Sequence, residues 1–535
     1  MNETAERRCD RQTVCIAAFA ACASLLSFLI YFRRGEILLL GDAVAHINIA
    51  RRVFDSRTPG PLQLGTVWLP LPHLLMMPLV GSKWAWRTGL GGSIPSMVAY
   101  VFGVLGIYRL MRGISQSLLP GFSPRCPTCL AAAIYGLNPN LLYLQATAMT
   151  ESLYLAFFVW AVVHCGEFLT ASEGERKRGS LWMCGFCLAG ASLTRYDGWF
   201  AAAAVAGLVI VSACRDPRRS ARGLIVKFAL VSAAVPLLWF AYNGIIYRNP
   251  LEFANGPYSA RAIEKKTAVP GFPPHPGTND LSVAAAYFLK AGLSNVVEGS
   301  WQAVWLLPAL AGSLIAIRGR QSPALLLWSP LPFYMLSVAY GGVPIFTPDW
   351  WPHSLYNIRY GVQLLPVLAI FLPTAAVYLV NRAPTDAGKL VAFLAIGFVV
   401  LCYASVWRAK PVAFREAWVN SRTRLQLESQ LAEKLQQLPA GSTFLMHLGD
   451  HVGALQEAGI PLCRSINEGN HRVWKQPSDP EGLWEQSLAD PGQHADFVVA
   501  TEGDTVWQAV HARSFPVVVK IEVSGQRPVT IYRTR

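Results

Sequence analysis

Charged residues are scarce in this sequence. Asp, Glu, Lys and Arg make up only 15% of its 535 residues, whereas 53% are hydrophobic, and the mean hydropathy is +0.33. Soluble domains usually contain about 25% charged residues. Because the deficit extends over most of the chain, an ordinary soluble enzyme is excluded, and a lipid bilayer is the expected solvent.

Acidic residues are scarcer than basic ones. The chain has 32 Asp and Glu against 46 Lys and Arg, which gives a formal net charge of +14. The basic residues do not form a segment of the kind that binds nucleic acid, so nucleic acid is not an expected partner. They lie in short segments between apolar runs, a pattern that reports the orientation of membrane helices.

Cysteine is present without a metal-binding pattern. Most of the 11 cysteines lie inside apolar runs, and two pairs, Cys126/Cys129 and Cys184/Cys187, have C-x-x-C spacing. No histidine partner lies near either pair in sequence, so buried thiols are favoured over a metal or redox site. We expect no cofactor, and the alternative of a divalent cation stays open.

Apolar runs recur along the first three quarters of the chain. A helix needs roughly 20 residues to cross about 30 Å of hydrocarbon. The first run carries no charge and is too long for a typical signal peptide, so we expect it to be retained as a span. Eleven runs, one of them short, occupy residues 14–32, 93–110, 127–146, 150–169, 181–194, 199–214, 224–246, 302–317, 323–340, 360–380 and 390–407. The sequence therefore predicts an α-helical polytopic membrane protein with about 11 transmembrane helices.

Six basic segments fall on one side of the membrane if each run spans once. They contain Arg7, Arg8 and Arg11; Arg109 and Arg112; Arg176, Lys177 and Arg178; Arg215, Arg218, Arg219 and Arg222; Arg318 and Arg320; and Arg382 and Lys389. The positive-inside rule makes that side cytoplasmic. We therefore expect a multi-pass protein of a bacterial-type inner (cell) membrane, with a cytoplasmic N-terminus and a C-terminal part on the outer side.

Residues 408–535 differ in composition from the membrane domain expected over residues 1–407. A helical pattern over residues 422–438 is followed by strand-like runs at 443–447, 497–500, 516–523 and 529–532. This order predicts a small C-terminal α/β extracytoplasmic domain. The other long outer segments are the first outer loop, 33–92, a second long outer loop, 247–300, and the segment 341–358.

The first outer loop contains an acid where a membrane helix ends. Asp42 and His46 share one face if residues 41–52 are helical, because residues four apart are neighbours. We expect an amphipathic helix at the membrane surface, and an acid at this depth is costly unless it is used. Farther along, Trp68 and the prolines Pro70 and Pro72 predict an interfacial turn in which no helix continues.

The order of these segments resembles the GT-C superfamily of membrane glycosyltransferases. The matching features are an Asp soon after the first span, an outer tail, and the segments Thr150-Glu151-Ser152, Leu193-Thr194-Arg195-Tyr196-Asp197-Gly198 and Asn357-Ile358-Arg359-Tyr360. The chain is similar to bacterial protein O-mannosyltransferases and aminoarabinose transferases, which are glycosyltransferase 39-like proteins. One departure is that the family often has an acidic pair at the first-loop site, whereas Asp55 lies well downstream of Asp42.

The resemblance implies an inverting transferase that moves a sugar from a polyprenyl-phosphate carrier to a protein, lipid or polysaccharide acceptor. Asp42 would be the general base, and His46 would orient Asp42 or the acceptor. The residues implied to bind the donor phosphate are Arg195, Arg359, Lys265 and Lys266. Further candidates are Arg52, Asp55, Glu151, Asp197, Asp349 and His353.

Several alternatives stay open. Glu151 also suits a helix cap, Arg195 and Asp197 also suit a surface ion pair, and Asp349 with His353 provides too few ligands for a metal site. A lipid or sugar transporter or flippase is also polytopic and basic, although such proteins usually contain internal repeats, which this sequence lacks. A ligase or polymerase of the O-antigen type is the other alternative. The sequence identifies neither the sugar nor the acceptor.

Overall fold

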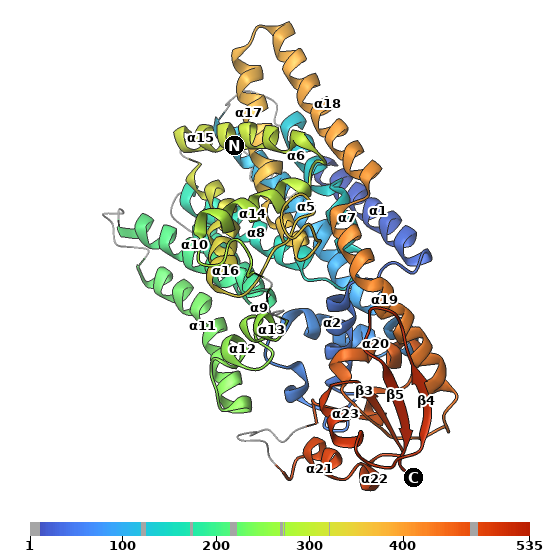
Figure 1. Cartoon of the computed structure of the whole chain (residues 1–535). Coiled ribbons are helices and arrows are strands. Elements are labelled where there is room, and N and C mark those ends of the chain that lie inside the picture. The colour runs from blue at the N-terminus through green and yellow to red at the C-terminus, as the bar shows by residue number, and fades with distance from the viewer. Residues whose placement is uncertain are drawn as a thin grey trace.

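The computed structural model describes residues 11–118, 125–171, 175–214, 222–267, 271, 273–319, 321–470 and 480–535. Helices dominate the chain, and a small sheet lies at one end of the molecule, near the C-terminus (Figure 1). Several residues of the predicted basic segments lie outside the described residues: Arg7, Arg8, Arg215, Arg218, Arg219 and Arg320.

The described residues up to Gln436 form helices and short 3-10 turns, joined by loops. The helices are α1 (Arg11–Arg33), α2 (Gly41–Arg52), α3 (Leu71–Val80), α4 (Lys83–Thr88), α5 (Leu90–Leu118), α6 (Arg125–Gly136), α7 (Pro139–Gln145), α8 (Glu151–Thr170), α9 (Glu175–Thr194), α10 (Asp197–Cys214), α11 (Arg222–Tyr247), α12 (Glu252–Asn255), α13 (Ala260–Thr267), α14 (Leu281–Ser294), α15 (Leu306–Arg318), α16 (Pro330–Tyr340), α17 (Leu365–Arg382), α18 (Thr385–Ala409) and α19 (Val412–Gln436). The 3-10 turns are η2 (Pro61–Leu64), η3 (Ser300–Trp305), η4 (Ser322–Trp328) and η5 (Ile358–Leu364).

Within the described residues, 8 helical segments are long and apolar enough to cross a membrane. The predicted class, a polytopic helical protein, is therefore confirmed, whereas fewer segments reach this length than the eleven apolar runs suggest. One reason lies in the run 127–146, which is split into α6 and α7. The side chain of Asn138 accepts hydrogen bonds from the backbone N–H groups of Asn140 and Leu141, and Pro139 follows it. These two residues begin a new helix instead of continuing the old one.

The C-terminal part forms a five-stranded sheet in the order β2-β1-β3-β5-β4. Its elements are β1 (Phe444–Met446), α20 (Leu448–Ala458), η6 (Leu462–Arg464), β2 (Ser465–Ile466), α21 (Leu483–Ala489), α22 (Pro491–His494), β3 (Phe497–Thr501), α23 (Thr505–Val510), β4 (Val517–Ile521) and β5 (Val529–Arg533). Strand β1 runs parallel to β2 and β3, whereas β5 runs antiparallel to β3 and β4. The four predicted strands are confirmed, and the two-residue β2 was too short to predict.

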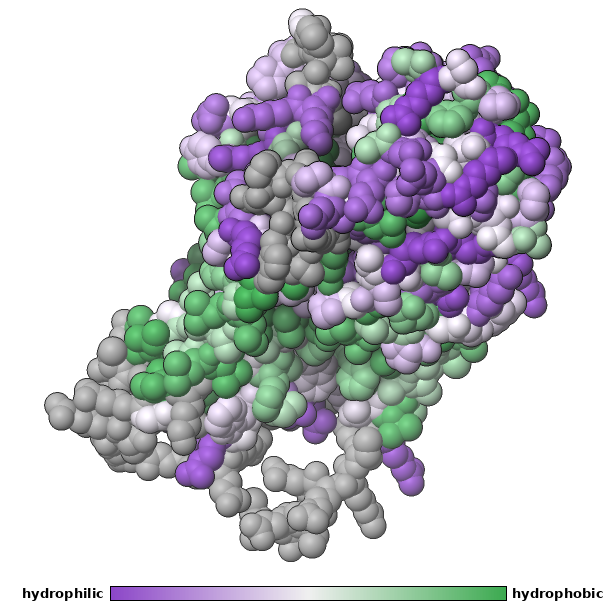
Figure 2. Space-filling model, turned by 90° about the horizontal axis from the view of Figure 1, so that it is seen from below, coloured by the Kyte–Doolittle hydropathy of each residue, from purple (hydrophilic) through white to green (hydrophobic). Residues whose placement is uncertain are grey.

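Both faces of the central strands are covered. On one face, Leu445 and Val498 pack with Val506 of α23, and on the other, Met446 and Val499 belong to the main core that includes α19. Seen from this end of the molecule, hydrophilic side chains gather over the C-terminal part, and hydrophobic side chains form the surface beside it (Figure 2). The polarity of the surface therefore changes where the sheet meets the helical bundle.

Helix α2 is helical as predicted, but it is not a surface helix. Its side chains Ala43, Ile47 and Ala50 are fully buried, because α3 covers one side of the helix and α20 of the C-terminal part covers another. The prediction of an interfacial helix was wrong because the sequence pattern does not reveal that the tail folds back onto the first outer loop.

The prolines after Trp68 begin a helix. Pro70 is the N-cap residue of α3, and Pro72 lies in its first turn. The missing N–H of proline costs nothing there, since the first N–H groups of a helix have no partner within the helix. The predicted turn is present at Trp68, where the chain is not helical, whereas Pro72 lies inside the helix that follows, and this helix places His73 in the interior.

Three buried residues join α20 to the first outer loop. Asn48 Nδ2 donates to Gln456 Oε1 at 2.6 Å, Gln456 Nε2 donates to the backbone carbonyl of Trp86 at 2.8 Å, and Trp86 Nε1 donates to Asn48 Oδ1 at 2.9 Å. We call Asn48, Trp86 and Gln456 the joint. It closes a cycle of hydrogen bonds that fixes α2 to the C-terminal part.

Candidate active site

A cavity of about 800 Å³ lies beside α2. It brings together residues that are far apart in the sequence. Its polar and charged wall includes Asp42, His46, Thr150, Arg195, Asp197, Arg261, Tyr334 and Arg359. Aromatic side chains, among them Trp68, Phe253 and Tyr360, provide much of the remaining wall. Cavities with apolar walls and a few convergent polar groups are the usual form of ligand sites.

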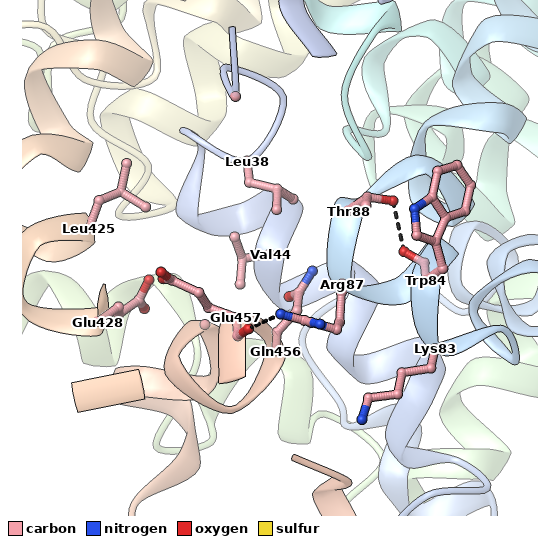
Figure 3. A pocket seen from close by; sticks show the side chains of 12 residues that line it. Leu38, Val44, Lys83, Trp84, Arg87, Thr88, Leu425, Glu428, Gln456 and Glu457 are labelled. Atoms are coloured by element: carbon pink, nitrogen blue, oxygen red, sulfur yellow. Dashed lines mark hydrogen bonds between the residues drawn. The ribbon is translucent and has the colours of Figure 1, made fainter. Parts of the chain in front are cut away.

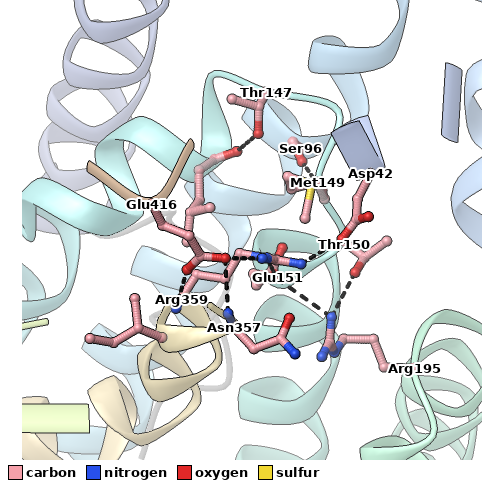
Figure 4. A network of polar contacts seen from close by, with 12 residues as sticks. Asp42, Ser96, Thr147, Met149, Thr150, Glu151, Arg195, Asn357, Arg359 and Glu416 are labelled. Carbon is pink, nitrogen blue, oxygen red and sulfur yellow. Dashed lines mark hydrogen bonds and ion pairs between the residues drawn. The ribbon is translucent and has the colours of Figure 1, made fainter. Parts of the chain in front are cut away.

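Arg359, on η5, is shared by three carboxylates (Figure 4). Its Nη2 lies 2.5 Å from Asp42 Oδ2, its Nη1 pairs with Glu416, and its Nε lies 3.6 Å from Glu151. The side chain of Arg359 is only 6% exposed. A buried guanidinium needs such partners because the cost of removing it from water is several kcal/mol.

Glu416 reaches this cluster from α19, beyond the last predicted span. Its two carboxylate oxygens also accept the backbone N–H groups of Asn357 and Arg359, each at 3.1 Å. Glu416 therefore fixes the backbone of η5 as well as the side chain. The sequence analysis missed this residue, and the signal that could have found it is an acid within the apolar stretch Val412, Ala413, Phe414 and Ala417.

Arg195 lies between α9 and α10 and makes a second polar centre. Its Nη1 donates to Thr150 Oγ1 at 2.9 Å, its Nη2 donates to Tyr334 OH at 2.8 Å, and its Nε lies 3.2 Å from Asp197 Oδ2. Arg195 and Asp197 do pair, as one alternative proposed, but in the cavity wall and not at the protein surface. Both arginines also lie over the ring of Tyr360, at 4.9 and 5.0 Å from its centroid.

Glu151 connects the two arginines. One carboxylate oxygen lies 3.6 Å from Arg195 and 3.6 Å from Arg359. The side chain is completely buried, and neither oxygen makes a hydrogen bond within the described part of the chain. Glu151 also lies in the first turn of α8, where an acid suits the helix dipole, although neither of its oxygens accepts a backbone N–H from the described residues.

Asp42 is the accessible carboxylate of the cluster. Its side chain is 41% exposed, whereas those of Glu151, Asp197 and Glu416 are each no more than 1% exposed. The contact with Arg359 uses Oδ2, so Oδ1 is the oxygen that remains for a ligand. Asp42 can therefore meet a molecule in the cavity, while the three buried acids hold the arginines.

His46 lies one turn beyond Asp42 on the same face of α2. Its Nδ1 is 2.9 Å from Nε2 of His73, and its ring packs on Trp68 with centroids 4.8 Å apart. Burial lowers the pKa of His46 from 6.5 to about 4, against the attraction of Asp42 and with the repulsion of Arg195 and Arg359. The imidazole is therefore neutral near pH 7.

The second long outer loop contributes a different cation from the two that were predicted. Lys265 and Lys266 end α13 and do not line the cavity, whereas Arg261 of the same helix does. Arg261 donates from Nε and Nη2 to the backbone carbonyl of Tyr340, at 3.0 and 2.6 Å. This carbonyl is neutral, so neither bond joins Arg261 to a carboxylate. No local pattern distinguishes Arg261 from its lysine neighbours in the sequence.

The remaining candidates lie outside the cavity lining. Asp55 pairs with Arg51 at 2.8 Å and accepts the backbone N–H of Cys463, and these bonds lower the pKa of the Asp55 carboxyl despite its partial burial. The other three make contacts elsewhere: Arg52 donates to the carbonyl of Gln63, Asp349 pairs with Lys290, and His353 contacts the carbonyl of Pro348.

No group of three or more His, Cys, Asp or Glu side chains in the described part of the chain is placed to hold a metal ion.

A second cavity, of about 670 Å³, lies on another side of α2 (Figure 3). Val44 and α4 line it from the first outer loop, and α19 and α20 line it from the other side. Arg87 crosses toward α20, where its Nη2 donates to the carbonyl of Glu457 at 2.8 Å. This cavity contains none of the predicted site residues, so the candidate active site is the cavity around Asp42.

No protein-family model matches the chain, and no curated protein matches it. Several solved structures do match the chain. ArnT from Cupriavidus metallidurans bound to undecaprenyl phosphate is similar with a TM-score of 0.58 and 14% sequence identity, over 98% of each chain. The apo state of the same protein gives a TM-score of 0.57 and 15% identity, over 97% of each chain.

An oligosaccharyltransferase from Archaeoglobus fulgidus, in complex with Zn and sulfate, matches with a TM-score of 0.48 and 10% identity. The match covers 91% of this chain and 68% of that protein. The similarity to ArnT extends over almost the whole of both chains. The chain therefore shares its fold with ArnT, and the fold that the resemblance implied is confirmed.

Proposed function

We propose that this protein is an inverting glycosyltransferase that moves a sugar from a polyprenyl-phosphate carrier to an acceptor on the extracytoplasmic side of the membrane. The observation that carries the proposal is one accessible carboxylate, Asp42, on the wall of a cavity that also contains three arginines, Arg195, Arg261 and Arg359. Support comes from the shared fold with ArnT, a protein solved with undecaprenyl phosphate bound.

The reaction is a single displacement. The acceptor hydroxyl gives its proton to Oδ1 of Asp42, and its oxygen attacks the anomeric carbon of the sugar. The bond between that carbon and the phosphate oxygen breaks, and the phosphate leaves with the electron pair. Because attack and departure occur on opposite faces of the carbon, one such step inverts its configuration.

The leaving phosphate needs cations. Arginine suits this role because its planar guanidinium can bond two phosphate oxygens at once. Arg195 and Arg359 already contact four carboxylates between them, so a phosphate must share them with Asp42, Glu151, Asp197 and Glu416. Arg261 donates to a neutral carbonyl, so no carboxylate in this contact competes with a phosphate. We therefore propose Arg261 as a phosphate contact beside Arg195 and Arg359.

The orientation follows from the charge of the short segments. The basic residues Arg318, Arg382 and Lys389 lie near the ends of α15, α17 and α18. The turn between α17 and α18 lies at the end of the molecule opposite the sheet (Figure 1). The positive-inside rule favours a cytoplasmic position for that end. The C-terminal part and the cavity beside α2 would then lie on the extracytoplasmic side of a multi-pass membrane protein.

The proposed function is tested by a transfer assay in membranes that contain the full-length protein and radiolabelled polyprenyl-phosphate sugars. Asp42→Asn keeps the shape of the side chain and removes the base, so turnover should fall by about 10²- to 10⁴-fold. Asp349→Asn is the matched control, because Asp349 is an outer-loop acid that pairs with Lys290 outside the cavity. Its turnover should stay within about twofold of wild type.

Membrane insertion of both variants is checked by their abundance in the membrane fraction. Equal turnover of wild type and Asp42→Asn would remove Asp42 from the mechanism. If the wild-type protein releases no sugar from any labelled carrier, the proposed transferase activity is wrong.

A further inference from the structure

The histidine behind His46 has no assigned role. His73, on α3, is fully buried, and its Nε2 lies 2.9 Å from Nδ1 of His46. Its other nitrogen, Nδ1, is also buried and makes no hydrogen bond within the described residues. Burial lowers the pKa of His73 as well as that of His46, so both rings are neutral at pH 7.

Two neutral histidines joined by one hydrogen bond have two arrangements. If His46 donates from Nδ1, His73 must carry its own proton on Nδ1, where no acceptor is present. If His73 donates from Nε2, its Nδ1 has only a lone pair without a partner. Buried N–H groups without an acceptor are rarer in proteins than acceptors without a donor. The second arrangement is therefore favoured, and it leaves the proton of His46 on Nε2.

We propose that His73 is a positioning residue: it donates its Nε2–H to His46 and thereby fixes His46 as the tautomer that offers Nε2–H to a phosphate oxygen of the carrier lipid. This inference rests on the proposed function. His46 lines the cavity, and the contact with His73 uses only its Nδ1, so Nε2 is the nitrogen that remains for a ligand.

The phosphate is a better partner for this N–H than the acceptor hydroxyl. A donor bonded to the attacking oxygen would withdraw its lone pair and weaken the nucleophile, whereas a donor bonded to the leaving phosphate stabilises the charge that develops there. The same cavity wall contains Arg195 and Arg359, whose charges act on the His46 ring. His46 would thus add a neutral donor to a set of cationic ones, without adding to the charge of the site.

The experiment measures the dissociation constant of undecaprenyl phosphate for the purified full-length protein in lipid nanodiscs. One hydrogen bond to a charged group corresponds to roughly 10- to 100-fold in affinity. His46→Leu should weaken binding by that factor, and His73→Leu should weaken it by up to about tenfold, because neither the tautomer nor the orientation of the His46 ring is then fixed. His73→Gln, whose amide can donate from nearly the same place, should bind within about threefold of wild type.

The double variant separates positioning from a general structural effect. If His73 acts through His46, His46→Leu/His73→Leu should bind no more weakly than His46→Leu alone. His275→Leu is the control, because this histidine is also buried and bonded through Nε2, to the carbonyl of Ile345, but does not line the cavity. Its affinity for undecaprenyl phosphate should match wild type.

Two results would overturn the inference while the wild type still binds undecaprenyl phosphate: unchanged affinity in His73→Leu, or additive losses in the double variant. If the wild type itself does not bind, the proposed function fails and this inference fails with it. Thermal unfolding of each variant shows whether it is folded, and recovery of affinity in His73→Gln supports the inference independently of stability.

Discussion

At the scale of single residues, the acids that contact Arg359 in the candidate site differ in their exposure to solvent. Arg359 is almost completely buried, yet it contacts one accessible acid, Asp42, and the buried acids Glu416 and Glu151. The buried acids hold the arginine in place whether or not a ligand is bound. Asp42 can therefore exchange its contact with Arg359 for a contact with substrate without leaving the cation unpaired.

Removal of Arg359 should be far more costly than removal of the neighbouring Arg415. Arg359→Met leaves the buried Glu416 without its cation and leaves Glu151 with Arg195 alone, so we expect a loss of about 3–5 kcal/mol in the free energy of unfolding. Arg415→Met breaks a partly exposed pair with Glu298 and should cost about 1 kcal/mol or less. Thermal unfolding in detergent measures both. In Arg359→Met, the further change Glu416→Gln should recover part of the loss, and equal costs for the two arginines would contradict this account.

The neutral state of His46 predicts how stability depends on pH. Its pKa is about 4 in the folded protein and 6.5 without burial. The unfolded chain therefore binds the proton more readily, and stability should fall as the pH is lowered from 6.5 to about 4. The shift corresponds to about 3 kcal/mol at the low end of this window. His46→Gln removes the titration, so its stability should vary less over the same range in thermal unfolding at stepped pH.

At the scale of elements, two short segments decide where the charges lie. The first is η5, which follows Asn357, a residue in the left-handed conformation with φ of 55°. Two residues after Arg359, Gly361 lies against the backbone of Ala291 and Gly292 in α14, closer than any side chain allows. The second is the start of α19, which brings Glu416 over η5. The position of Arg359 is thus set by backbone packing as well as by ion pairs.

A methyl group at Gly361 tests this packing. Gly361→Ala would force η5 away from α14, so we expect a loss of about 1–3 kcal/mol in stability, and a loss of turnover because Arg359 moves with η5. Gly397→Ala in α18 is the matched control, since a Cβ there meets nothing within 4 Å. It should leave turnover unchanged. Similar turnover in the two variants would show that the site does not require this close approach.

Sequence patterns predicted the elements better than their contacts. Apolar runs predicted helices, and strand-like runs predicted the strands at 497–500 and 529–532, because these signals are local. The surface position predicted for α2 was wrong, since its cover comes from α20, more than four hundred residues later in the chain. The site was predicted in part: Asp42, Arg195 and Arg359 stand out as charges beside apolar runs, whereas Glu416 and His73 acquire their contacts only through folding.

At the scale of the whole molecule, the sheet and the turn between α17 and α18 mark two opposite ends (Figure 1). Helix α2, which lines the cavity, is bonded to α20 beside the sheet. A membrane between these ends would keep the two sets of loops in different compartments. The proposed orientation can therefore be tested with one residue at each end.

Labelling of introduced cysteines provides that test. Ser514→Cys places a thiol at an exposed position of the C-terminal part, and Asp386→Cys places one at the exposed start of α18. A membrane-impermeant maleimide should label Ser514→Cys in intact cells and Asp386→Cys only after permeabilisation. The unsubstituted chain measures the background from its own exposed cysteines, Cys15, Cys22, Cys126 and Cys129. The opposite pattern would place the cavity on the cytoplasmic side.

The joint of Asn48, Trp86 and Gln456 has a consequence for anyone who exchanges parts between such proteins. Helix α2, which carries Asp42, is held in place by hydrogen bonds to Gln456 in the tail. Loss of either bond would leave a buried polar group without a partner. A hybrid that receives its tail from a relative must receive a matching first outer loop too. The residues that position Asp42 therefore come from two separate parts of the sequence, and a hybrid joined at residue 407 would separate them.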